Sequence, residues 1–223
     1  MSFRYLLTRI GEFVSERQVR RADASLNYVE VGRWMRAKGF RHITRVVGRE
    51  QLWAMAAAQL QGRKVLYLEF GVFKGDATRR WVELLPDPQC MFHGFDSFEG
   101  LPEVWRPGYD AGHFDVQGAI PVINDARVTF HKGWFDQTLP LFEVPDHDVL
   151  MLNVDADLYS STKLIFEKLA DHIRVGSYLY FDEFNERFHE LKAFDEFMTE
   201  TNMTFDLVGA TRTLQKAMFV RTK

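Results

Sequence analysis

Short apolar runs constrain the fold of this chain more than any other feature of its sequence. Three of them, at 64–70, 148–154 and 177–181, are almost entirely aliphatic or aromatic. Strands buried on both faces of a parallel sheet have this character, whereas a strand with one wet face alternates apolar and polar residues. Helix-forming stretches separate the runs, such as the one that includes Ala77 and ends before Pro86. This alternation predicts a doubly wound, mostly parallel α/β sheet.

The ends of the chain have a different pattern. Further β-type runs lie at 91–95, 127–130, 204–209 and 215–220. The last two are joined by a polar turn and predict a C-terminal antiparallel hairpin. The first sixty residues show helical spacing and are rich in helix formers. We therefore expect an N-terminal helical segment over 1–60 and a sheet domain over 61–223.

Charge is distributed unevenly along the 223 residues. The whole chain carries a formal net charge of −3, which gives no reason to expect a nucleic-acid partner. Residues 1–50 contain eleven Lys/Arg and five Asp/Glu, or +6, which leaves −9 for the remainder. A basic helical segment next to an acidic body is interpreted as a solvated face, with a membrane surface or an acidic partner as the alternative. We also expect it to act as a lid over the body or as a contact between subunits of a homo-oligomer.

Cysteine content and hydropathy bear on the compartment. Cys90 is the single cysteine, which excludes an internal disulfide and fits a reducing environment. Arginines interrupt the apolar residues at the N-terminus before a signal-peptide core is reached, and no later run approaches the length of a membrane span. We expect a cytoplasmic protein without an integral membrane segment.

A glycine-bearing turn follows the first long apolar run. Gly71 and Gly75 allow the backbone and a helix N-terminus to come close to a ligand. Their Gly-x-x-x-Gly spacing differs from the dinucleotide fingerprint, which disfavours a nucleotide-binding oxidoreductase. Glu69 would repel a pyrophosphate but attract a cationic cofactor such as S-adenosylmethionine. Alternatively, Glu69 caps the turn or pairs with an arginine.

Asp96 ends the next β-type run, about 25 residues beyond the glycine turn. Doubly wound folds present an acid to ribose hydroxyls at this place. Ser97 is positioned to assist. The alternative is that Asp96 and Ser97 are turn formers before Gly100.

Four carboxylates follow the two later apolar runs: Asp155, Asp157, Asp182 and Glu183. Strand ends of a parallel sheet meet at one edge, where crowded acids repel unless protons or a cation neutralise them. Mg²⁺ suits an all-oxygen site of this kind. Each acid is also able to cap a following helix, and Asp157 is the best placed to do so.

The histidines lack the paired spacing of metal ligands. His113 is the one retained as a candidate catalytic residue, because it lies in a loop expected to cover the pocket.

Four ordered motifs resemble the macrocin O-methyltransferase family. They occupy 69–75 (Glu-Phe-Gly-Val-Phe-Lys-Gly), 94–102 (Gly-Phe-Asp-Ser-Phe-Glu-Gly-Leu-Pro), 132–140 (Lys-Gly-Trp-Phe-Asp-Gln-Thr-Leu-Pro) and 155–162 (Asp-Ala-Asp-Leu-Tyr-Ser-Ser-Thr). The resemblance implies a seven-stranded, Rossmann-like class I methyltransferase fold. It also implies an S-adenosylmethionine- and Mg²⁺-dependent enzyme of the kind that methylates sugar hydroxyls of macrolide and aminocoumarin antibiotics.

The resemblance further implies roles for individual residues. In the family pattern the methionine end of the cofactor is lined by Glu69, Gly71 and Gly75, the ribose is held by Asp96 and Ser97, and the adenine or acceptor side is bordered by Gly133 and Trp134. Mg²⁺ is held by Asp155, Asp182 and Glu183, with Asp157 as the candidate base. The chain departs from the family in two places, since it has Asp155-Ala156-Asp157 for Asp-Gly-Asp and Asp182-Glu183 for Asp-Asp.

Two other functions remain open from the sequence. The same metal chemistry suits a catechol or another vicinal-diol small molecule as methyl acceptor. A non-catalytic S-adenosylmethionine-binding interaction protein is the other alternative, with its basic N-terminal helices as the contact surface. The acceptor and the oligomeric state are not encoded in any motif.

Overall fold

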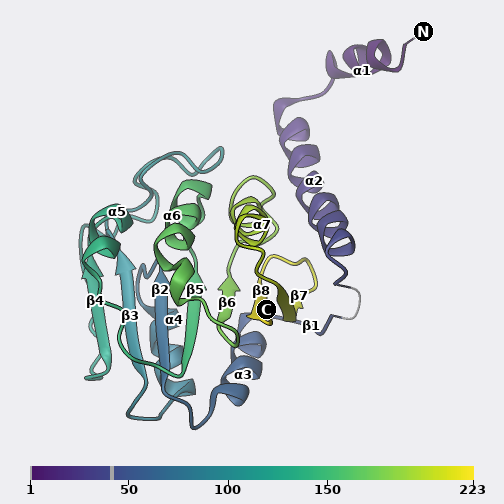
Figure 1. Ribbon diagram of the computed structural model, residues 1–223. Coiled ribbons are helices and arrows are strands. Elements are labelled where there is room, and N and C mark those ends of the chain that lie inside the picture. Colours follow the sequence, from purple (N-terminus) through teal and green to yellow (C-terminus); the bar gives the residue numbers. More distant parts are fainter. Residues whose placement is uncertain (1, 41–42) are drawn as a thin grey trace.

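The computed structural model describes residues 2–40 and 43–223, so residues 1, 41 and 42 of the N-terminal segment lie outside the described residues. Strands and helices alternate along the chain (Figure 1). The strands are β1 (Arg45–Val46), β2 (Val65–Phe70), β3 (Met91–Asp96), β4 (Val128–Lys132), β5 (Val149–Val154), β6 (Tyr178–Phe181), β7 (Phe205–Thr211) and β8 (Ala217–Arg221). The α-helices are α1 (Phe3–Gly11), α2 (Glu16–Ala37), α3 (Arg49–Leu60), α4 (Asp76–Leu84), α5 (Phe135–Thr138), α6 (Tyr159–Leu169) and α7 (Glu190–Thr201). Two 3₁₀ turns, η1 (Leu139–Leu141) and η2 (Ala170–His172), follow α5 and α6.

All described strands belong to one sheet, with the order β1-β7-β8-β6-β5-β2-β3-β4. Among them, β8 alone runs antiparallel to its neighbours, β6 and β7. The predicted mostly parallel sheet and its C-terminal hairpin are therefore confirmed. The sheet also has an eighth strand, β1, at the edge beside β7. Two residues are too few to show a hydrophobic pattern, so this strand could not be predicted from the sequence.

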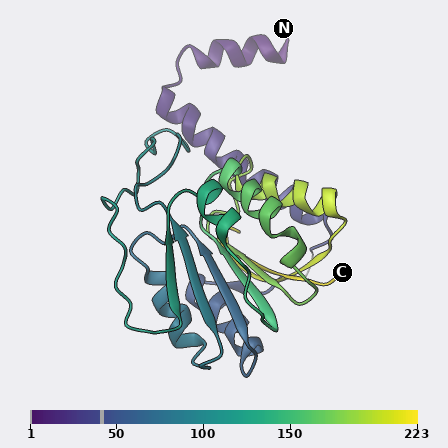
Figure 2. The ribbon, with the colours of Figure 1, turned by 60° about the vertical axis from the view of Figure 1, so that its left-hand side comes forward.

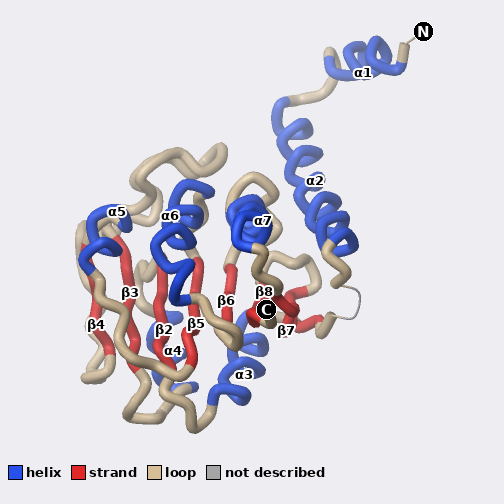
Figure 3. The backbone as a smooth tube through the Cα atoms, in the orientation of Figure 1, coloured by secondary structure: helices blue, strands red, loops and turns tan. Residues whose placement is uncertain are grey.

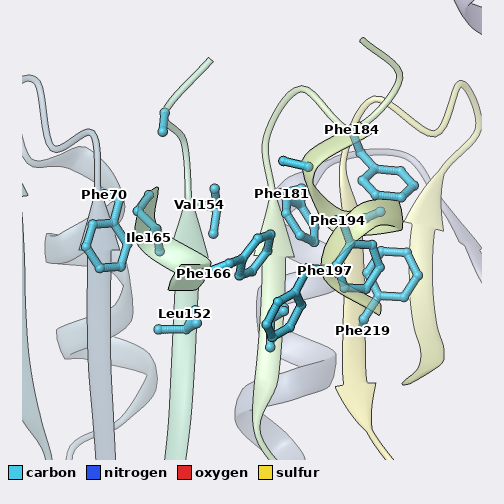
Figure 4. Close-up of a cluster of buried hydrophobic side chains, with 14 of the residues drawn as sticks. Phe70, Leu152, Val154, Ile165, Phe166, Phe181, Phe184, Phe194, Phe197 and Phe219 are labelled. Carbon is cyan, nitrogen blue, oxygen red and sulfur yellow. The ribbon is translucent and has the colours of Figure 1, made fainter. Parts of the chain in front are cut away.

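The central strands are buried on both faces, as their continuous apolar sequences predict. Every residue of β2, β5 and β6 is buried. Helices α6 and α7 cover one face, where Phe166, Phe181, Phe194 and Phe219 pack together (Figure 4). Helices α3 and α4 cover the other face (Figure 3). Strand order reverses between β2 and β5, which opens a crevice at their carboxyl ends.

The N-terminal segment is partly joined to the sheet. Helix α3 packs in the core on one face and β1 pairs with β7, so residues 45–60 are continuous with the sheet. The end of α2 buries Val31 and Met35 in the core cluster that includes residues of α6 and α7. In contrast, α1 buries no residue and stands away from the body (Figures 1 and 2). No described helix combines the length and the apolar character needed to cross a bilayer.

Candidate active site

A cavity of about 860 Å³ lies at the carboxyl ends of the central strands. Nine of the twelve residues predicted as functional line it: Gly71, Asp96, Ser97, His113, Trp134, Asp155, Asp157, Asp182 and Glu183. Glu69, Gly75 and Gly133 are not among the lining residues. The sequence pattern thus identified the floor of the cavity, which is made of strand ends. Its side wall consists mainly of residues from the loop after β3, of which Ser97 and His113 were predicted.

The turn after β2 needs a glycine for steric reasons. Gly71 has φ +91°, and a Cβ at this position would lie 1.9 Å from the carbonyl oxygen of Asp155. Its N–H donates to the carbonyl of Phe95. The turn after β2 therefore lies against the backbone at the ends of both neighbouring strands, β3 and β5. Gly75, with φ +77°, precedes α4 and donates to the carbonyl of Val72.

Asp96 connects the end of β3 to this turn. Its Oδ2 accepts hydrogen bonds from the N–H groups of Val72 (2.8 Å) and Phe73 (2.7 Å), and its Oδ1 accepts one from Phe98 (2.7 Å). Ser97 accepts from the Glu99 N–H and donates to the Gly100 carbonyl. The turn-forming interpretation of both residues is confirmed. Each carboxylate oxygen has two acceptor sites, so a ribose contact by Asp96 stays a prediction.

Glu69 lies behind the cavity in a buried polar cluster. Its Oε2 accepts hydrogen bonds from the hydroxyls of Tyr67 (3.0 Å) and Thr78 (2.6 Å), and Asn153 donates to the Tyr67 hydroxyl. Burial raises the pKa of Glu69 to about 8, although both hydrogen bonds oppose the rise. At neutral pH this carboxyl is therefore mostly protonated.

The carboxylates that follow β6 have hydrogen-bonding partners in the protein, whereas the carboxylates that follow β5 have none among the described residues. The Asp182 carboxylate pairs with the Lys216 ammonium (2.6 Å) and accepts from the Tyr180 hydroxyl (2.7 Å). The Glu183 carboxylate accepts from the Gln215 amide at 2.9 and 3.1 Å. Hydrogen bonds from described residues to the carboxylates of Asp155 and Asp157 are absent. Asp157 is 8% exposed and has a left-handed backbone, with φ +59°.

Crowding and burial raise the pKa of Asp155, Asp157 and Glu183. Burial is the main cause that raises the pKa of Asp155 well above its usual value, and the charges of Asp182 and Asp157 add to it. The pKa of Asp157 is raised to about 7 by burial and by Glu183 and Asp182. Burial also raises the pKa of Glu183. The predicted mutual repulsion of the strand-end acids is thus present in the structure.

Two residues of this cluster were not predicted. Glu190, at the start of α7, is fully buried; its Oε2 accepts from the Glu183 N–H (3.1 Å), while its Oε1 has no partner among the described residues. Lys216 comes from the turn between β7 and β8. In the sequence, an acid in a first helical turn and a lysine in a polar turn are both typical of solvated positions. Their burial follows only from the tertiary fold.

The side wall of the cavity is aromatic. Trp105, Tyr109, His113 and Phe114 contact one another in sequence order, with centroids 5.0, 4.5 and 4.4 Å apart. The Arg106 guanidinium lies 3.8 Å from the Trp105 ring centroid and 4.5 Å from that of Tyr109. His113 is therefore part of a packed wall that faces the cavity. Its catalytic role stays a prediction.

Arg106 also links this aromatic wall to helix α2. It donates to Glu186 (2.6 Å), and Asn27 of α2 donates to the same carboxylate (2.9 Å). Arg187 in turn binds Asp23 (2.7 Å) and the Asn27 side chain (2.8 Å). Segments far apart in the sequence are thus joined beside the cavity.

Sheet order, the antiparallel β8 and a cavity at the switch point give the protein the α/β fold of class I methyltransferases. The O-methyltransferase NovP has the same fold: its structure aligns with a TM-score of 0.62 and 22% identity, covering 78% of this chain and 80% of that one. Residues 113–213 match the macrocin-O-methyltransferase (TylF) family. The matched residues include the motifs at 132–140 and 155–162, so the match supports the family resemblance found in the sequence.

Two curated relatives agree with this assignment. The demethyldecarbamoylnovobiocin O-methyltransferase of Streptomyces niveus is 27% identical over 135 residues, which are 52% of this chain and 50% of the relative. The 8-demethyl-8-(2,3-dimethoxy-alpha-L-rhamnosyl)-tetracenomycin-C 4'-O-methyltransferase of Streptomyces olivaceus is 30% identical over 131 residues, 49% of this chain and 44% of the relative. The chain spans about half the length of these relatives.

Proposed function

We propose that the protein is an S-adenosylmethionine-dependent, Mg²⁺-dependent O-methyltransferase that acts on a hydroxyl of a sugar or of a glycosylated natural product. One observation carries the proposal. A single cavity at the switch point of a methyltransferase fold joins the glycine turn, the acid after β3 and the acids after β5 and β6. The relative from Streptomyces olivaceus, whose name describes methylation of a rhamnosyl compound, supports the choice of acceptor class.

The cofactor is assigned to the side of the cavity between β2 and β3. Gly71 permits close approach of its backbone, Asp96 and Ser97 face the ribose, and Trp134 borders the adenine. Asp96 is well suited to this task because three backbone N–H groups fix its carboxylate in place. S-adenosylmethionine supplies an electrophilic methyl group on a sulfonium, and Mg²⁺ would supply a Lewis acid that lowers the pKa of a bound hydroxyl.

Asp157 is assigned as the base that takes the proton from the acceptor hydroxyl. A pKa of about 7 gives comparable populations of carboxylate and carboxylic acid near neutral pH, which favours proton transfer in that range. The side chain is almost fully buried, so it is kept from bulk water at the floor of the cavity. The aromatic wall of Trp105 and Tyr109 holds the acceptor over it and excludes solvent.

The chemistry of the acids fits a divalent cation, but their arrangement fits it less well. Asp155, Asp182 and Glu183 supply only oxygen donors, and their crowding calls for positive charge. However, within residues 2–40 and 43–223 no three His, Cys, Asp or Glu side chains are arranged to hold a metal ion. The reason is visible in their contacts, because Asp182 pairs with Lys216 and Glu183 with Gln215. The Asp155 carboxylate has no such partner among the described residues, so we propose Asp155 as the first ligand of Mg²⁺.

Calorimetry and a transfer assay test the proposed function. S-adenosylhomocysteine should bind the protein and NADH should not. Labelled methyl groups should then pass from S-adenosylmethionine to glycosylated acceptors, stop on addition of EDTA and resume with Mg²⁺. Transfer only to catechols would move the acceptor class to vicinal-diol small molecules. Binding of S-adenosylhomocysteine without transfer to either class would favour the interaction protein, and absence of binding would refute the proposal.

A further inference from the structure

Lys216 is a partly buried cation in the acidic cluster. Its Nζ lies 2.6 Å from Asp182 Oδ2 and donates to the Asp182 carbonyl oxygen at 2.8 Å. Only 18% of its side chain is exposed, and 13% of that of Asp182. The Lys216 backbone is fixed as well, since its N–H donates to Thr211 Oγ1 (3.0 Å) and its carbonyl accepts from the Thr211 N–H (2.9 Å). The ammonium is thus held in place by the β7–β8 turn.

The remaining contacts of Asp182 also come from side chains of the protein. Its Oδ1 accepts from the Tyr180 hydroxyl, and the Arg49 guanidinium lies 4.0 Å from the same atom. Both carboxylate oxygens are consequently occupied by donors of the protein. Asp155, in contrast, has an unpaired carboxylate on the same cavity, as far as the described residues show. Asp182 therefore has cationic partners, whereas Asp155 has none among the described residues.

A divalent ion shared by Asp155 and Asp182 would meet the Lys216 ammonium at the Asp182 carboxylate. Two cations on one carboxylate repel strongly in a site with little water. We propose that Lys216 is the resident counter-cation of Asp182 and competes with the divalent metal for it, so that the metal binds only when the ammonium leaves that carboxylate. This inference rests on the proposed Mg²⁺ dependence. Lys216 is then a positioning residue, which sets the affinity for the metal without being one of its ligands.

Metal binding to charge-removing variants tests the competition directly. Lys216→Met keeps the apolar stem and removes the charge, and Lys216→Arg keeps the charge. Lys168→Met removes an exposed lysine of α6 as a control. The probe is Mn²⁺ alone, without cofactor or acceptor, with the free ion followed by electron paramagnetic resonance and the heat of binding by calorimetry. Circular dichroism and thermal unfolding check the fold of each variant.

Competition predicts at least tenfold tighter Mn²⁺ binding by Lys216→Met, with Lys216→Arg and Lys168→Met within about twofold of the original protein. Lys216→Gln retains a donor for Asp182 without the charge, and takes the place of the Met variant if that one does not fold. If the original protein binds Mn²⁺ and the charge-free variants bind it equally well or more weakly, the role of Lys216 alone is overturned. Failure of all four proteins to bind Mn²⁺ would overturn both this inference and the proposed metal dependence.

Discussion

Glu69→Gln should make the protein less sensitive to pH. The buried carboxyl has a pKa of about 8 in the folded protein against an ordinary value of 4.5. Between these two values the folded state binds one proton more than the unfolded state. The free energy of unfolding of the original protein therefore falls as pH rises through this window, and levels off above about pH 8. Glutamine has nearly the same shape as the protonated acid and cannot ionise.

The size of the effect follows from the shift. One pKa unit corresponds to about 1.4 kcal/mol, so the variant should gain roughly that much relative to the original protein for each pH unit across the window. The full shift sets an upper bound of about 5 kcal/mol above pH 8. Near pH 5 the two proteins should be about equally stable, because the amide of the introduced glutamine retains an oxygen that accepts from Tyr67 and Thr78.

Urea unfolding followed by tryptophan fluorescence measures this difference. Trp81 is buried, with its ring centroid 5.4 Å from that of Tyr67, and reports on the same region. Glu83→Gln, at an exposed position of α4, controls for loss of one negative charge. Other buried acids contribute pH dependence to all three proteins, which is why the difference between them is the quantity of interest. Parallel stability curves for the original protein and Glu69→Gln from pH 5 to 8.5 would refute the raised pKa.

Further predictions concern the cofactor site, the acids Asp155 and Asp157, and helix α1. Asp96→Ala should weaken S-adenosylhomocysteine binding by about 1 to 3 kcal/mol in calorimetry, since charge-assisted hydrogen bonds are lost; unchanged affinity would remove Asp96 from the cofactor site. Asp155→Asn should lose Mn²⁺ binding and turnover together, whereas Asp157→Asn should keep the metal and slow the chemical step by about 10² to 10⁴. A normal rate for Asp157→Asn would place the base elsewhere, with His113 as the next residue to test. Deletion of residues 1–14 removes α1, which buries nothing within one chain, so the thermal unfolding of the monomer should change little. Any oligomer held together by α1 should dissociate, which light scattering measures as a lower mass. An unchanged mass would argue against a subunit contact through α1.

Local sequence patterns were sufficient for the sheet and the cavity floor. Apolar runs such as Val149–Val154 are buried on both faces because of their own composition. A residue at the end of such a strand lies at the switch point once the strand order is set, which is why Asp155 and Asp96 were found. Gly71 was predicted as a glycine that lets a ligand approach the turn, and the structure shows in addition that the turn leaves no space for a Cβ.

Contacts between distant segments explain what the sequence did not predict. Lys216 and Asp182 are 34 positions apart, and their pairing depends on the antiparallel register of β6 and β8. Arg106 lies in a loop without periodicity, and its partner Glu186 is 80 positions away. The sequence suggested a local turn at Asp96, but not its hydrogen bonds from the N–H groups of Val72 and Phe73, because backbone donors are present in every sequence.

The link from Arg106 to α2 matters for anyone who wishes to change which compounds fit the cavity. Directed evolution usually varies residues that line a pocket, and here that choice would include Trp105 and Tyr109 but omit Asn27 and Glu186. Glu186 orients the guanidinium that lies over both rings, and Asn27 holds the Glu186 carboxylate. Libraries that vary the rings together with this polar pair will reach wall shapes that libraries of lining residues alone cannot.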